Sequence, residues 1–360
     1  MRKIYFVIIL VSALYSCQKD VSSTSNTDPP PGVDVYVAGY IADLGAGIPA
    51  YWKNGKLVLV DSAHYNITPY YGLAGAGALS IAVSGNEVYM TGYEIYQSPY
   101  TGDHYYGICW KNGMPVDLTA GSTSAVKPVT PTIAVSGTDV YVAGNDNGCA
   151  NNIVAKYWKN AQAVTLSSDC RMWADASSIA VSGTDVYVAG YEDNGFYVAK
   201  YWKNGTPVNL PSDATKNAFA ESIAVSGNDV YVAGYEATPG NDEGVAKYWK
   251  NGNPVNLSNA AKYARATSIA VSGADVYVAG YEYIGNATPA VAKYWKNGIA
   301  INLSDGTKNA FAESIAVSGT DVYVAGFENS VAKYWKNGTP VILGDVTKES
   351  KAYSIFLVKK

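Results

Sequence analysis

One short phrase recurs along the whole chain and constrains its fold more than any other feature. The phrase Asp-Val-Tyr-Val-Ala-Gly begins at Asp34, Asp139, Asp185, Asp229, Asp275 and Asp321, and a variant begins at Glu87. Each copy is followed by Trp-Lys-Asn, and six are preceded by Ser-Ile-Ala-Val-Ser-Gly or a close variant. The seven copies lie 44 to 53 residues apart. Leucine-rich and β-helix solenoids have periods of about half that length or less, so this spacing does not fit them.

Each repeat divides into four short strands. In the unit around Asp229 we expect strands at 222–225, 230–235, 245–249 and 254–257, called A to D below. The turn between strands C and D is Asn251-Gly252, and Asn-Gly favours a tight hairpin because both residues tolerate positive φ. Ala161 replaces this glycine in the third unit and predicts a strained turn. The pattern therefore predicts an all-β, seven-bladed β-propeller.

The two ends of the domain predict how the ring closes. The first unit starts at Val33 with strand B, and the chain ends with a segment, Ile355 to Val358, that reads as an orphan strand A. We expect this C-terminal strand to pair with Val35 to Tyr40 and complete the first blade. Closure of this kind removes exposed sheet edges.

The blade pattern resembles the kelch and galactose-oxidase group of propellers. An apolar strand A, a Tyr-Val-x-Gly strand B and an aromatic strand C carry the resemblance over the whole domain. It implies the fold and no activity, because kelch blades have a Gly-Gly pair where this chain has Gly234-Tyr235-Glu236.

Residues 1–17 read as a targeting segment. Arg2 and Lys3 precede an apolar run that ends in Leu-Tyr-Ser-Cys17, which resembles a bacterial lipobox; an ordinary secretory signal is the alternative. Residues 18–32 read as a flexible tether, and 33–360 as the propeller. We expect a monomer attached to the bacterial cell envelope, at the outer membrane, through lipid on Cys17 only. A net charge of −4 gives no footprint for nucleic acid.

Loop lengths indicate which face of the ring binds. The A–B and C–D turns are short and uniform, whereas the B–C and D–A loops on the other face vary, and binding residues concentrate on such loops. The D–A loops share the pattern x-Ala-x-Ala-x-Ser, whose variable positions could project toward the centre of the ring or wedge between blades. The candidates for ligand binding are Trp173, Asp175, Phe219, Tyr263, Arg265 and Phe311.

A second set of candidates gathers in the loops of the first two blades. These loops are rich in tyrosine, whose rigid ring and polar tip suit sugars or protein partners. Burial of the loops against one another is the alternative. The candidates are Tyr70, Tyr71, Tyr96, Tyr100, His104, Tyr105 and Tyr106.

Acidic residues recur at the end of strand B and invite a metal or catalytic interpretation. In five blades, however, a lysine stands two residues before the strand C tryptophan, which favours cross-strand ion pairs. Glu94 faces Ile108 instead, and is therefore a further candidate for ligand binding.

No catalytic, metal or cofactor motif is present. Cys109 is expected to be buried, and Cys149 and Cys170 to form a disulfide. We therefore expect a binding module for a glycan or a protein. The alternatives are a polysaccharide hydrolase or lyase and a scaffold subunit of an envelope complex. A central cluster of unpaired carboxylates would favour the hydrolase or lyase.

Overall fold

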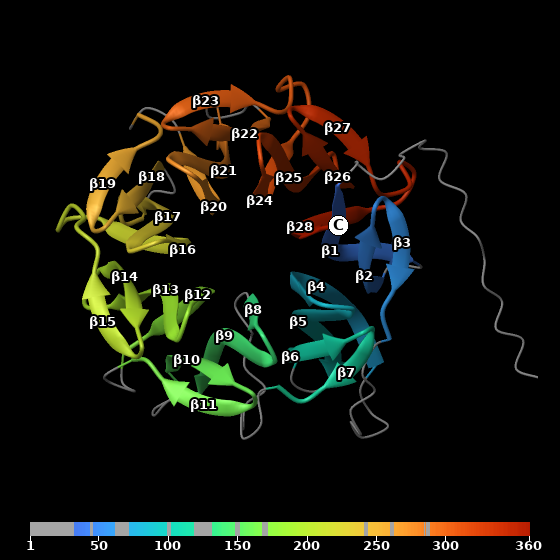
Figure 1. Ribbon diagram of the computed structural model, residues 1–360, viewed down its shortest axis with the longest axis horizontal. Helices are drawn as coiled ribbons and strands as arrows, with labels where there is room; N and C mark the ends of the chain where they lie inside the picture. The colour runs from blue at the N-terminus through green and yellow to red at the C-terminus, as the bar shows by residue number, and fades with distance from the viewer. Residues whose placement is uncertain are drawn as a thin grey trace, which may run out of the picture.

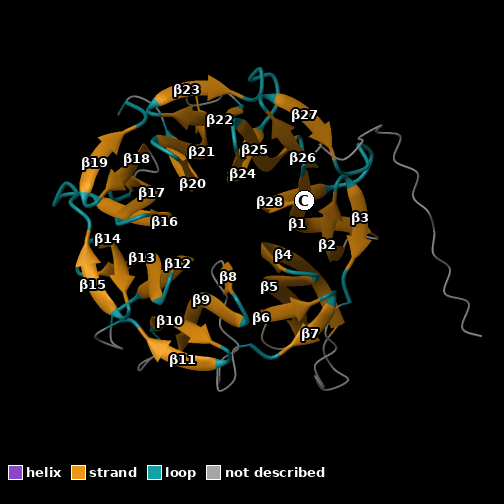
Figure 2. Cartoon of the chain, in the orientation of Figure 1, coloured by secondary structure: helices purple, strands orange, loops and turns teal. Residues whose placement is uncertain are grey.

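The computed structural model describes residues 32–43, 46–61, 72–98, 102–118, 132–147, 152–167, 172–240, 244–259, 263–283, 285 and 289–360. These residues form seven antiparallel sheets of four strands each, arranged around a central axis (Figure 1). All the regular structure drawn in Figure 2 is strand. Within the described part of the chain, there is no helix long and apolar enough to cross a membrane. The predicted seven-bladed propeller is confirmed.

The blades follow one another along the chain, and the innermost strand of each blade is named first. Blade 1 consists of β28 (Ser350–Lys359), β1 (Val33–Asp43), β2 (Ala46–Lys53) and β3 (Lys56–Leu59). Blade 2 consists of β4 (Gly72–Ser84), β5 (Glu87–Ser98), β6 (Gly102–Lys111) and β7 (Met114–Val116). Blade 3 consists of β8 (Thr132–Ser136), β9 (Asp139–Asn147), β10 (Ile153–Lys159) and β11 (Gln162–Thr165).

The other four blades repeat this order. Blade 4 consists of β12 (Ala174–Ser182), β13 (Asp185–Asp193), β14 (Tyr197–Lys203) and β15 (Thr206–Asn209). Blade 5 consists of β16 (Asn217–Ser226), β17 (Asp229–Ala237), β18 (Gly244–Lys250) and β19 (Asn253–Asn256). Blade 6 consists of β20 (Ala264–Ser272), β21 (Asp275–Tyr283), β22 (Ala290–Lys296) and β23 (Ile299–Asn302). Blade 7 consists of β24 (Ala310–Ser318), β25 (Asp321–Glu328), β26 (Val331–Lys336) and β27 (Thr339–Ile342).

The C-terminal strand closes the ring as the sequence predicts. Strand β28 pairs with β1, with Ile355 opposite Val37 and Leu357 opposite Val35. The last strand of the chain thereby becomes the inner strand of the first blade (Figure 1). The two ends of the propeller are thus held together by a sheet rather than by a loop.

Tryptophans of the third strands fill the spaces between blades. Trp202 of blade 4 is fully buried against Tyr141 of blade 3, and Trp249 of blade 5 is fully buried against Tyr187 of blade 4. These contacts confirm that the recurring tryptophan belongs to the core. Because each blade buries its tryptophan on the preceding blade, the apolar core runs round the ring.

Serines of the inner strands link neighbouring blades. In six cases a serine hydroxyl accepts the backbone N–H of an isoleucine in the next inner strand, at 3.2 to 3.3 Å. The donors would otherwise be unpaired, because the inner strand is the edge of its sheet. Blade 3 has Thr132 at this position, and its buried hydroxyl has no hydrogen-bond partner. The seventh link is therefore missing.

The uniform face is stabilised by contacts between its turns. In blade 5 the Asn251 side chain accepts the N–H of Val230 at 2.8 Å and donates to Asp229 at 2.7 Å. The carboxylate of Asp229 also pairs with Lys250 at 3.0 Å, and these partners lower its pKa. In blade 3, Ala161 adopts a φ of 67°, in the left-handed region where glycine stands in the other blades. The predicted strain of that turn is confirmed.

Two segments predicted to be loops are strand. The segment x-Ala-x-Ala before strand A continues the inner strand, so that β16 begins at Asn217 rather than at Ser222. The B–C loop of the second unit, for which the sequence predicts a long loop over residues 95–107, is mainly hairpin, with Tyr96 opposite His104. Both errors have the same cause: strand pairing across a sheet extends elements beyond their locally apolar core.

Candidate functional site

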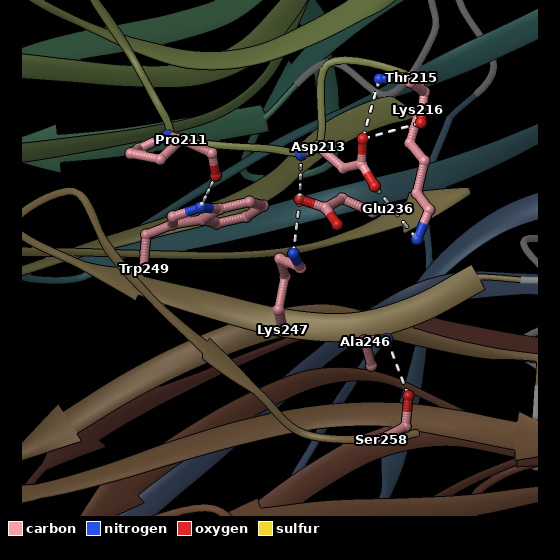
Figure 3. Close-up of polar contacts among 9 residues, drawn as sticks. All are labelled: Pro211, Asp213, Thr215, Lys216, Glu236, Ala246, Lys247, Trp249 and Ser258. Atoms are coloured by element: carbon pink, nitrogen blue, oxygen red, sulfur yellow. Dashed lines mark hydrogen bonds and ion pairs between the residues drawn. The ribbon is translucent and has the colours of Figure 1, made fainter. Parts of the chain in front are cut away.

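The acids at the end of the second strands form ion pairs, as predicted. Figure 3 shows the example of blade 5, where the Lys247 ammonium lies 2.5 Å from the Glu236 carboxylate and both side chains are more than 90% buried. The same strand C lysine lies 5.6 Å from the centre of the Trp249 ring. Equivalent pairs are Lys156–Asp146, Lys200–Glu192, Lys293–Glu282 and Lys333–Glu328. Each of these acids is thus paired with a lysine of the neighbouring strand in its own hairpin.

Glu94 has no strand C lysine beside it, as predicted, but it is not an unpaired acid. Its lysine partner is absent, yet the residue has no exposed surface and is not without an interaction partner. Its backbone lies opposite Tyr106 in the hairpin of β5 and β6. The expectation of an unpaired acid is therefore wrong, and its role toward a ligand stays a prediction.

A belt of large side chains surrounds the axis at the end of the inner strands that faces the variable loops. In this inner belt, a large residue of five of the seven inner strands stands opposite a residue of the second strand of its blade. The pairs are Asp175 with Tyr191, Phe219 with Tyr235, Arg265 with Tyr281, Phe311 with Phe327, and Lys351 with Tyr40.

Each inner-strand member of the belt also contacts the preceding blade. The ring of Phe219 stacks on Tyr235 of its own blade at 4.8 Å and meets Tyr191 of blade 4 edge-on at 5.0 Å. Phe311 likewise lies 5.0 Å from Phe327 and 4.8 Å from Tyr281. The inter-blade position considered for these residues is thus observed, and ligand contact by their remaining exposed surface stays a prediction.

Two residues further along, the same five inner strands each carry a β-bulge whose extra residue belongs to the same region. The register shifts at Ser177, Glu221, Thr267, Glu313 and Tyr353, which we call the bulge residues. The glycine of the repeated phrase makes the bulge possible. A Cβ on Gly234 would lie 1.9 Å from the carbonyl oxygen of Phe219. Only glycine allows the two backbones to come this close.

Two bulge residues are glutamates that resist ionisation. Burial raises the pKa of Glu221 to about 7, with a further contribution from Asp175, while Arg265 acts in the opposite direction. Burial also raises the pKa of Glu313 to about 7, with a contribution from Glu221, and Lys351 and Arg265 oppose it. Both residues keep part of their surface exposed. Carboxyls of blades 5 and 7 therefore influence one another across blade 6.

Asp175 is a buried acid with a full set of partners. It accepts hydrogen bonds from the Asn145 amide at 3.0 Å, the Ser177 hydroxyl at 3.2 Å and the Tyr191 hydroxyl at 3.4 Å. Burial outweighs these bonds and raises its pKa to about 6. Asn145 also accepts the N–H of Ala176 at 3.0 Å.

Arg265 is the cation of the belt in blade 6. Its guanidinium lies 4.5 Å from the centre of the Tyr235 ring and 5.4 Å from that of Tyr263. Its Nε is buried and has no hydrogen-bond partner. No carboxylate of the described residues lies within ion-pairing distance of it.

The remaining predicted residues are scattered. Trp173 precedes β12, and its side chain is 39% exposed. Tyr263 packs edge-on against Tyr283 at 5.2 Å. Tyr70, Tyr71, Tyr100, Cys17, Cys149 and Cys170 lie outside the described residues, as do the side chains of Tyr96, His104, Tyr105 and Tyr106. Cys109 is buried as predicted, and burial raises the pKa of its thiol to about 12.

The sequence contains a signal for the bulge residues that was passed over. They occupy the third variable position of x-Ala-x-Ala-x-Ser, where Glu221 and Glu313 stand among Ser, Thr, Leu and Tyr in other blades. The candidates predicted from this pattern occupy its first two variable positions, and the third carries the adjacent acids. The described residues contain no group of three or more His, Cys, Asp or Glu side chains that could hold a metal ion.

The fold and this site define a seven-bladed β-propeller with a mixed aromatic and acidic cluster around its axis. No family model and no curated protein matches the chain. Among solved structures it is similar to a mutant of puromycin hydrolase, at 11% identity and a TM-score of 0.51, over 87% of this chain and 52% of that one. The chain thus spans about half the length of that hydrolase.

Two further solved structures are less similar. A thermostable family-43 glycoside hydrolase matches at 10% identity and a TM-score of 0.39, over 68% of this chain and 97% of that one. A putative TolB from Agrobacterium tumefaciens matches at 11% identity and a TM-score of 0.43, over 76% of this chain and 88% of that one. At 11% identity, the similarity to the puromycin hydrolase mutant concerns the fold alone and says nothing about activity.

Proposed function

We propose that the chain is a glycan-binding propeller whose ligand lies over the inner belt, at the loop-facing end of blades 4 to 7. One observation carries the proposal: half-exposed aromatic rings and unpaired carboxyls occur together at this end. Rings such as Phe219 and Phe311 offer apolar faces to the C–H groups of a sugar, and Glu221 and Glu313 offer hydrogen bonds to its hydroxyls.

The chemistry of the site fits a polar ligand better than an apolar one. Among the described residues, neither Glu221 nor Glu313 has a hydrogen-bond or ion-pair partner. Both carboxyls keep some exposed surface, and sugar hydroxyls would supply donors and acceptors for them. A protein partner would instead be expected to contact the outer loops of several blades.

A glycan array tests the proposal. The purified protein would be compared with a bulge variant, Glu221→Ala with Glu313→Ala, and with a loop variant in which Tyr70, Tyr71, Tyr105 and Tyr106 are changed to Ala. Binding lost in the bulge variant and retained in the loop variant supports the proposed site. The reverse pattern would move the site to blades 1 and 2. A blank array would favour a protein partner.

A second candidate function is glycoside hydrolysis, favoured by the pKa of about 7 at Glu221 and Glu313. A carboxyl that is protonated near neutral pH can act as a general acid, and a second one can act as base or nucleophile. Release of reducing ends from a bound glycan, abolished by Glu221→Gln or Glu313→Gln, would establish this reaction. Binding without release would leave a binding module.

The proposal includes attachment to the cell envelope through lipid on Cys17. The lipobox-like sequence and the polar tether that follows support it. Expression with a labelled fatty acid should label the natural chain and not a Cys17→Ala variant. Labelling of both would contradict lipidation at this cysteine.

A further inference from the structure

We propose that Arg265 is a specificity-determining residue of this site and that the natural glycan carries a carboxylate, as a uronic acid does. The inference rests on the proposed function, because it assigns the class of sugar to the same site. It starts from a guanidinium that has no carboxylate of the described residues within ion-pairing distance and whose Nε has no hydrogen-bond partner.

The guanidinium of Arg265 is held in place without being neutralised. It lies between the rings of Tyr235 and Tyr263, at 4.5 and 5.4 Å from their centres. Aromatic faces stabilise a cation, but they offer no acceptor for its N–H groups. The buried Nε has no partner, and the described residues provide no carboxylate within 4.0 Å of the guanidinium. Part of the side chain remains exposed.

Packing does not explain why an arginine stands at this position. Phe219 in blade 5 and Phe311 in blade 7 occupy the same place in the repeat and fill the same gap between blades. A charge moved from water into such a gap loses solvation, which a phenylalanine does not. The cation of blade 6 therefore has a cost that its neighbours avoid, and a ligand anion would offset it.

The neighbouring groups favour an anion over a cation at this point. Lys351, the other cation of the belt, already pairs with Glu349 at 3.4 Å. The carboxyls nearest to Arg265, those of Glu221 and Glu313, are poor counterions because burial disfavours their charged forms. In the neutral form each can donate a hydrogen bond to a carboxylate. A ligand carboxylate would thus meet one guanidinium and two possible O–H donors.

Matched acidic and neutral forms of one sugar provide the test. The probes are the trimer of galacturonic acid, a tetrasaccharide of hyaluronan, and the methyl esters of both, measured by calorimetry at pH 6 on the full chain. We expect the acid of at least one pair to bind about 10- to 100-fold more tightly than its ester, which is the size of one hydrogen bond to a charged group.

Variants at Arg265 separate specificity from folding. Arg265→Phe places in blade 6 the residue of blades 5 and 7, so we expect an unchanged or higher melting temperature and an acid-to-ester ratio near one. Arg265→Lys should retain part of the ratio, because lysine keeps the charge and loses the two-pronged geometry. Lys296→Gln, on the uniform face, should leave the acid-to-ester binding ratio unchanged.

Each outcome decides the matter. Equal binding of acid and ester, or a ratio that survives in Arg265→Phe, overturns the role of Arg265 and leaves the glycan site standing. Tight binding of neutral array glycans alone overturns it as well. If no glycan of either charge binds, the proposed function fails and this inference fails with it.

Discussion

The two glutamates near the axis make a prediction about stability and pH that follows directly from their environment. Replacing Glu221 or Glu313 by Gln removes a group whose charged form is disfavoured by burial, while retaining its size. In each case the pKa rises from an ordinary value of 4.5 to about 7. The native protein therefore holds these protons more tightly than the unfolded chain does.

The sign and size follow from linkage. Since the folded pKa is the higher one, the stabilisation is fully present below pH 4.5 and is lost as the pH rises through 7. A difference of this size corresponds to about 3 kcal/mol for each residue when fully ionised. Because both side chains keep some exposed surface, we expect about 1–2 kcal/mol of stabilisation from each Gln at pH 8.

The two effects should not add. Glu221 contributes to the raised pKa of Glu313, so removing one carboxyl makes ionisation of the other easier. The double variant should therefore gain less than the sum of the single variants. We expect a coupling of about 0.5 kcal/mol or more, as for residues that share one environment.

Urea unfolding followed by tryptophan fluorescence at pH 5 and pH 8 measures these values. Glu349→Gln is the control: the hydrogen bond from Tyr40 lowers the pKa of Glu349, so its replacement should lose stability at pH 8. An advantage of Glu221→Gln that is the same at both pH values would refute the reasoning. Loss of stability at pH 8 in both Gln variants would show that the carboxylates have stabilising partners.

Three further predictions concern the scaffold. Lys247→Met should cost about 3–5 kcal/mol, because it leaves Glu236 buried without its partner, and a second change, Glu236→Leu, should restore most of this in urea unfolding. Gly234→Ala should cost about 3 kcal/mol or fail to fold, because its Cβ would collide with the bulge; wild-type stability would show that the bulge relaxes. Trp202→Ala should cost about 3–5 kcal/mol, and an unchanged melting temperature would contradict its burial between blades.

The inner belt shows how one position can serve both the scaffold and a ligand. Its aromatic members join adjacent blades, which explains their recurrence without any ligand. The members that differ, Asp175 and Arg265, are the ones whose charge is expensive to bury. Asp175 meets that cost within the fold through three hydrogen bonds, and Arg265 does not. For this reason we expect Arg265, rather than the belt as a whole, to contact the charged group of the ligand.

The sequence alone determined the architecture, because the repeat places the same residue types at corresponding positions in seven units. The Asn-Gly turns, the alternating strands and the orphan terminal strand specify blade, count and closure, and the co-occurrence of Lys247 with Glu236 predicted an ion pair. Only the tertiary structure decided the site. Glu221 and Glu313 lie 92 positions apart in the chain, and each is the extra residue of a bulge beside the close backbone approach at Gly234 or Gly326. Their proximity and their raised pKa arise from ring closure and burial, which no local pattern expresses.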